Sequence, residues 1–143
     1  KYRSKSDLET YKKGHLLLRE GLDKRLFDNV YNLFIRGDYD TAVFRAYKEV
    51  EVRVREKAGL PDDLLGVNLM RKAFHPDEGK LTDMESLPAE RQATSDLFAG
   101  SIGLFKNPSS HRKVNLNDPS EAAEIILFAN YLLRLIDKCK VKI

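Results

Sequence analysis

Apolar residues recur at three- and four-residue steps along most of the chain, and this spacing predicts helices. A first helix is predicted over residues 22–35, with room for a shorter one before it, and Gly37 ends it. A second is predicted over residues 39–58, with Asp38 or Asp40 capping its start and Gly59-Leu60-Pro61 as its stop signal. Because no alternating strand pattern of useful length appears, the predicted fold class is all-α.

Two more helices are predicted in the middle of the chain. Asp62-Asp63 is expected to cap a short helix that runs to Phe74. The next helix begins at Pro88 and passes Phe105. Pro108 should end it, because proline lacks an N–H and restricts the residue before it, Asn107, to extended backbone.

The last helix has the clearest start. Asp118 is the predicted N-cap, Pro119 the first helical residue and Glu121 the residue that reaches back. Its apolar face covers more than half of the circumference, so it should lie in the centre of a bundle or face another subunit. The predicted architecture is a helical bundle of four core helices plus short additional helices.

Length and termini suggest the domain organisation. A chain of 143 residues is expected to form one domain, here residues 15–143, with residues 1–14 as a basic linker or frayed start. Since the first residue is Lys1 rather than Met, the domain is expected to be the C-terminal part of a longer protein, whose upstream region is unknown.

Composition narrows the function only a little. The net charge of +3 permits binding to RNA without demonstrating it. No apolar run is long enough for a membrane span and no signal-peptide pattern opens the chain, so a cytoplasmic protein without a membrane partner is expected. The single Cys139 excludes an intrachain disulfide and lies on the apolar stripe of the last helix, as a buried structural thiol would. Because His15 and His75 have no second His or Cys at metal spacing, neither a metal site nor a cofactor is predicted.

One turn concentrates groups that could do chemistry. The string Lys106-Asn107-Pro108-Ser109-Ser110-His111 places a cation, an amide, two hydroxyls and an imidazole between two helical patterns. From these residues alone, the same string also fits a helix stop, because Asn tolerates a cap, Pro breaks the helix, and Ser and His can bond local backbone. Both interpretations stay open at this point.

The string resembles the signature of the HEPN superfamily, in which an Arg, usually followed by Asn, Asp or His, precedes a His by a spacer of four to six residues. Further sequence segments resemble the Ymh family, and the resemblance extends from about residue 22 to residue 137. These segments are GDYDTAV (37–43), VEVRVR (50–55), LMRKAF (69–74), LFAG (97–100) and FANYLLRLID (128–137).

The resemblance implies a HEPN-like helical domain with a candidate chemistry, metal-independent RNA cleavage by transfer to the 2′-hydroxyl. His111 would act as base or acid, Lys106 would hold the phosphate, and Asn107 would donate its amide to a phosphate oxygen or orient the imidazole. The supporting residues would be Glu51, Arg55, Ser109 and Ser110. One sequence departure matters: Lys106 stands where the superfamily usually has Arg, and Lys lacks the planar fork that grips two oxygens.

The resemblance also implies partners and a setting. A homodimer would place two His111 side chains across one cleft, which supplies both an acid and a base. The expected context is prokaryotic (phage) defence or a toxin–antitoxin system, with an antitoxin as a further partner. The alternative is a non-catalytic helical dimerisation or RNA-binding module.

Overall fold

The computed structural model describes residues 5–19, 21–107 and 115–143, and this part of the chain is helical with no strand. The predicted all-α class is therefore confirmed, and the arrangement is compatible with a helical bundle. None of the helices in these ranges is both long and apolar enough to cross a membrane. The elements are α1 (Lys5–Arg19), α2 (Lys24–Ile35), α3 (Tyr39–Ala58), α4 (Gly66–Ala73), α5 (Pro88–Ser101), the π-helical segment η1 (Ile102–Lys106) and α7 (Pro119–Lys138).

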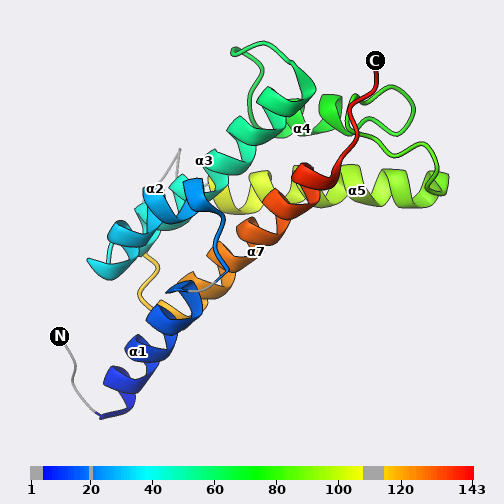
Figure 1. The fold of residues 1–143 in the computed structure, drawn as a ribbon. Helices are drawn as coiled ribbons and strands as arrows, with labels where there is room; N and C mark the ends of the chain where they lie inside the picture. The colour runs from blue at the N-terminus through cyan, green and yellow to red at the C-terminus, as the bar shows by residue number, and fades with distance from the viewer. Residues whose placement is uncertain (1–4, 20, 108–114) are drawn as a thin grey trace.

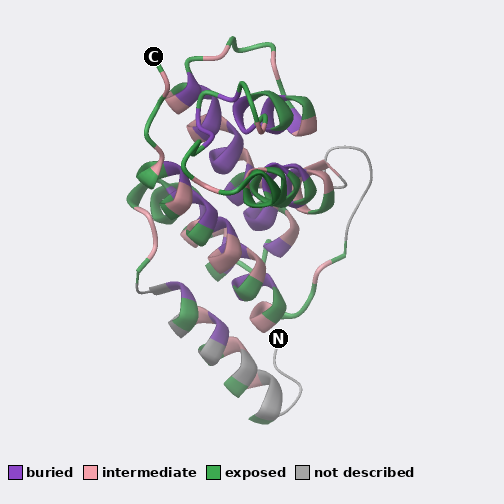
Figure 2. Ribbon diagram, turned by 90° about the vertical axis from the view of Figure 1, so that its right-hand side faces the viewer, coloured by how far each residue is buried: buried purple, intermediate pink, exposed green. Residues whose placement is uncertain are grey.

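Two long helices, α3 and α7, form the centre of the molecule (Figure 1). α1 packs along α7 at one end, α2 packs on α3, and α4 and α5 pack on each other towards the opposite end, where the C-terminal tail also lies. Buried residues face inward between these helices (Figure 2). Tyr47 on α3 is fully buried, and its hydroxyl donates to the carbonyl oxygen of Ile125 on α7, so the two central helices share a polar bond as well as apolar packing.

Residues 5–14, for which the sequence favoured a frayed start or linker, belong to α1 in the structure. α1 has a weak apolar period of its own, and packing stabilises it instead. Leu18 is fully buried in the core, Gly14 lies against Pro119 of α7, and the Tyr11 hydroxyl donates to the carbonyl oxygen of Ile35 at 2.8 Å. The helical body therefore begins before residue 15.

The start of α4 also differs from the prediction. Asp62 and Asp63 do not cap it; they lie in an exposed turn, and α4 begins at Gly66 with Leu65 in the N-cap position. The reason is a long-range contact. The Gly66 N–H, one of the first four N–H groups of α4 that have no partner within the helix, donates to the Glu51 side chain of α3 at 2.7 Å.

The end of the α5 pattern differs too. Pro88 is the first residue of α5, as predicted, but the helix continues past Ser101 as η1. Asn107 is helical, with φ −64° and ψ −41°, so the prediction of extended backbone before Pro108 is wrong. The Asn107 N–H donates to the carbonyl oxygen of Ile102, and this i→i−5 bond closes the last π turn and holds Asn107 in the helical region.

Candidate functional site

Lys106, the first residue of the predicted motif, is held by a buried carboxylate from another helix. Its ammonium lies 3.2 Å from Oε2 of Glu51, which is on α3 and fully buried. The Lys106 side chain is itself only 12% exposed. The structure thus brings together two of the residues predicted from sequence, 55 positions apart, at the point where η1 passes α3.

Glu51 has several partners besides Lys106, and we call this group the Glu51 cluster. Oε2 also accepts the Gly66 N–H, while Oε1 lies 3.1 Å from the Lys48 ammonium and 3.6 Å from Nη2 of Arg55. Arg55 is 9% exposed and donates through Nε to the carbonyl oxygen of Leu64, just before α4. The cluster therefore joins α3, α4 and η1, with three cations around one carboxylate.

The protonation state of Glu51 follows from these contacts. Burial alone would raise its pKa, because a low-polarity interior disfavours the charged form. The Gly66 N–H and the Lys48 and Lys106 ammonium groups outweigh burial, and the pKa of Glu51 is lowered. The side chain is therefore ionised near neutral pH, and Lys106 faces a carboxylate.

Sequence reasoning missed two members of the cluster, Lys48 and Gly66. Gly66 has φ +60°, a left-handed conformation that favours glycine, and its Cα side faces the Asn107 side chain. The signal in the sequence was an isolated Gly at the start of an amphipathic helix. What it did not reveal is that the acceptor for its N–H comes from α3, fifteen residues earlier.

The chain after the motif is also fixed to α3. The Leu116 N–H donates to Oδ1 of Asp40 at 2.9 Å, in the first turn of that helix. Asp40 was predicted as one of two alternative caps of α3; its carboxylate instead accepts this long-range bond, and Asp38, in the N-cap position, makes no side-chain cap bond. Both ends of the stretch that carries Ser109, Ser110 and His111 are thus anchored to one helix, while these three residues lie outside the described part of the chain.

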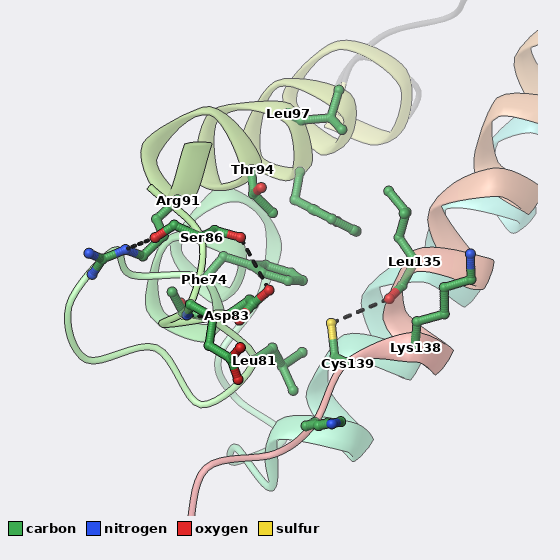
Figure 3. Close-up of a pocket in the computed structure, with 14 residues that line it drawn as sticks. Phe74, Leu81, Asp83, Ser86, Arg91, Thr94, Leu97, Leu135, Lys138 and Cys139 are labelled. Atoms are coloured by element: carbon green, nitrogen blue, oxygen red, sulfur yellow. Dashed lines mark hydrogen bonds between the residues drawn. The ribbon is translucent and has the colours of Figure 1, made fainter. Parts of the chain in front are cut away.

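A cavity of about 480 Å³ lies elsewhere, between the chain around residues 81–86, α5 and the end of α7 (Figure 3). Of the predicted site residues that the structure describes, Glu51, Arg55, Lys106 and Asn107, none lines it. Arg91 uses its guanidinium to bind the carbonyl oxygens of Pro76 and Ser86, and Asp83 accepts the Ser86 hydroxyl, so these polar groups hold the loop. The Cys139 thiol donates to the carbonyl oxygen of Leu135, and burial raises its pKa, which makes it a poor nucleophile.

The described histidines have structural surroundings. The His15 ring lies 3.8 Å from that of Tyr11 and 5.1 Å from that of Phe34, and burial lowers its pKa. Nδ1 of His75 accepts the N–H groups of Asp77 and Glu78 and so stabilises its own turn. Over residues 5–19, 21–107 and 115–143, no group of three or more His, Cys, Asp or Glu side chains is arranged to hold a metal ion.

A second ionic group lies on the other side of α3. The Arg53 guanidinium lies 2.8 Å from Asp23, 3.2 Å from Glu49 and 3.1 Å from Asp137. It therefore joins the start of α2 and the end of α7 to α3. Nearby, Asn130 of α7 accepts the Asp23 N–H and donates to the carbonyl oxygen of Gly21. These contacts are between described parts of the fold itself, which favours a structural role.

Comparison with known proteins places these features in a family. Searches of curated proteins and of solved structures found no match. A family profile described as "Protein of unknown function (Hypoth_ymh)" matches residues 20–136, which span the Glu51 cluster, the Lys106–His111 motif, and Arg53 with its partners Asp23 and Glu49. The chain belongs to the Hypoth_ymh family.

Proposed function

We propose that this protein is a HEPN-like, metal-independent endoribonuclease whose active segment runs from Lys106 to His111. The observation that carries the proposal is the contact of Lys106 with the buried, ionised Glu51. It fixes the start of the motif to the core, at a place where three cations surround one carboxylate. A fixed cationic environment is what a reaction with a developing phosphorane charge requires.

In the proposed reaction the 2′-oxygen attacks the adjacent phosphorus while a base removes the 2′-proton. The bond from phosphorus to the 5′-oxygen breaks, and an acid supplies the proton that this oxygen needs. The products are a 2′,3′-cyclic phosphate and a 5′-hydroxyl. His111 carries the imidazole of the motif, the side-chain type suited to proton transfer near neutral pH, and a homodimer would supply a second His111 so that one imidazole serves as base and the other as acid.

The test is incubation of the purified protein with a mixed single-stranded RNA in excess EDTA, with product ends analysed for 2′,3′-cyclic phosphate. His111→Ala should lower the rate at least about 100-fold, the usual contribution of a general acid or base. His75→Ala is the matched control, because His75 only stabilises its own turn, and it should cleave like the unchanged protein. Absence of cleavage by the unchanged protein, or cleavage that survives loss of His111, would contradict the proposal.

The second candidate is a non-catalytic dimerisation or RNA-binding module. The low exposure of the Lys106 side chain, 12%, favours it, because an ammonium that pairs with Glu51 in the fold already has a role in fixing the end of the helix. This candidate predicts RNA binding or self-association that is unaffected by His111→Ala. Defence or toxin–antitoxin roles, and an antitoxin partner, belong to the first candidate.

A further inference from the structure

Phe44 is a partly exposed phenylalanine that makes no contact with another aromatic ring in the described structure. The chain has seven phenylalanines, and six of them contact another aromatic ring. Phe44 makes no such contact, is partly exposed on α3, and is not among the residues that form the core or pack against it. Phe44 therefore stands outside the aromatic contacts that the other six make.

Phe44 lies on the side of α3 that carries the candidate site. Glu51 follows it by seven residues, which is about 20° short of two full turns and about 10 Å along the axis. Asp40, which holds Leu116, precedes it by four residues, or about one turn. The ring thus lies between the two positions at which the chain on either side of the motif is anchored to α3.

Lys48 provides a cation between the ring and the site. It is one turn after Phe44 on the same face of the helix, its side chain is 43% exposed, and its ammonium lies 3.1 Å from Oε1 of Glu51. The other oxygen of that carboxylate holds Lys106. A partly exposed ring followed by cations along one helix face is an arrangement by which proteins bind single-stranded nucleic acid, with a base on the ring and phosphates on the cations.

We propose that Phe44 is a stacking platform for a base of single-stranded RNA and that Lys48 contacts the phosphate next to it, so that the strand runs along α3 towards Lys106. This inference rests on the proposed function and assigns the part of the site that binds substrate. It adds a residue, Phe44, that takes no part in the chemistry.

The chain has no tryptophan, so Phe44→Trp creates a single tryptophan at the proposed platform, whose fluorescence can be excited apart from that of the six tyrosines. The probe is 2′-O-methyl octa-adenylate, which can stack but cannot be cleaved through its 2′-oxygen. Its addition should quench the fluorescence of Phe44→Trp, while an abasic strand with the same number of phosphates should not. Leu87→Trp is the control, because Leu87 is 66% exposed and lies at the start of α5, about 20 Å along that helix from η1.

Affinity for the same labelled strand, measured by fluorescence anisotropy, tests the individual side chains. Phe44→Ala should weaken binding by about tenfold or more, and Phe44→Tyr should retain it. Lys48→Gln should weaken binding and lower the slope of log affinity against log salt by about 0.7. A folded Phe44→Ala variant that binds as well as the unchanged protein overturns the inference.

The inference and the proposed function can fail separately. If the strand binds and RNA is cleaved, but Phe44→Trp is not quenched, the platform is wrong and the ribonuclease stands. If the strand binds and quenches Phe44→Trp, but no RNA is cleaved, the platform stands as part of a binding module and the ribonuclease is wrong. If the unchanged protein binds no strand at all, both are overturned.

Discussion

Glu49 and Glu51 are buried acids two residues apart on α3, and they leave the helix about 200° apart. Burial raises the pKa of Glu49 despite its contacts with Arg25 and Arg53. The pKa of Glu51 is instead lowered, because the hydrogen bond from the Gly66 N–H and the ammonium groups of Lys48 and Lys106 outweigh burial. The two residues look alike in the sequence, and only their partners in space decide which carboxylate is the more acidic.

The lowered pKa of Glu51 predicts how stability depends on pH. A carboxyl with a lowered pKa in the folded state stabilises the fold above its ordinary value of 4.5, and this contribution is lost as the pH falls through the folded-state pKa. Glu51→Gln should therefore lower the free energy of unfolding by about 3 kcal/mol at pH 7, because it leaves buried cations without their carboxylate. The difference from the unchanged protein should shrink below pH 4.5.

Urea unfolding of both proteins from pH 3 to pH 7 measures this difference. Glu56→Gln is the control, since Glu56 pairs with Arg25 in an exposed position and should cost less than about 1 kcal/mol. A difference for Glu51→Gln that does not change with pH would show that its charge does not stabilise the fold.

Two glycines of the candidate site region should respond in opposite ways to the same substitution. Gly66 has φ +60°, so Gly66→Ala should destabilise the protein by about 1 kcal/mol through backbone strain; the added Cβ would meet only Asn107 Oδ1, at an ordinary 3.8 Å. Gly100 lies within α5, and a Cβ there meets nothing within 4 Å, so Gly100→Ala should stabilise the helix by up to about 1 kcal/mol. Melting temperatures of the two variants should shift in opposite directions, and a rise for Gly66→Ala would contradict the conformation at α4.

At the scale of elements, sequence signals predicted those helix starts and ends that depend on bonds between neighbouring residues. Pro88 and Asp118 start their helices as expected, the latter by accepting the Ser120 N–H, and Gly59 ends α3 in the left-handed conformation. The start of α4 could not be predicted, because its first N–H bonds to Glu51 across the fold. The π turn before Asn107 was likewise missed, since α and π helices place apolar residues at similar steps over so few residues.

The site was predictable to a similar extent. The resemblance to known families singled out Lys106 and Glu51, and in the structure the Lys106 ammonium lies 3.2 Å from the Glu51 carboxylate. Periodicity alone would have assigned Glu51 to the core face of α3 as an unexplained polar residue. Lys48 was not found, because a lysine on a helix face is ordinary in any sequence; only its distance to the Glu51 carboxylate distinguishes it. The catalytic roles of the motif stay predictions.

The chain between α1 and α2 is attached to α7 by the side chain of Asn130. Asn130 on α7 holds the backbone between α1 and α2 through two bonds, to Gly21 and Asp23. Asn130→Ala should cost about 2 kcal/mol, and the loss should appear first as faster amide exchange in α1 and the start of α2. Asn29→Ala, which removes one exposed bond within α2, is the control and should change stability by less than about 0.5 kcal/mol. Uniformly faster exchange throughout the chain would mean that α1 is not a separate unit.

At the scale of the whole molecule, the two ionic groups on α3 divide the fold. The Arg53 contacts join α3 to the start of α2 and the end of α7, whereas the Glu51 cluster joins it to α4 and η1. α3 therefore has a structural side and a side that carries the motif. Phe44 and both anchors of the motif lie on the latter, and a second copy of the chain would have to approach from there to share a site.

The proposed dimer makes a quantitative prediction for mixed samples. If each active cleft needs His111 from both copies, a dimer with one His111→Ala subunit should be nearly inactive. When the two proteins are unfolded together in equal amounts and refolded, about one quarter of the dimers contain two unchanged subunits, so activity should fall to about one quarter. If each subunit worked independently, the mixed sample would keep about one half of the activity. Activity measured over a series of mixing ratios distinguishes a square-law decrease from a straight line, and a straight line would exclude a shared cleft even if the protein sediments as a dimer.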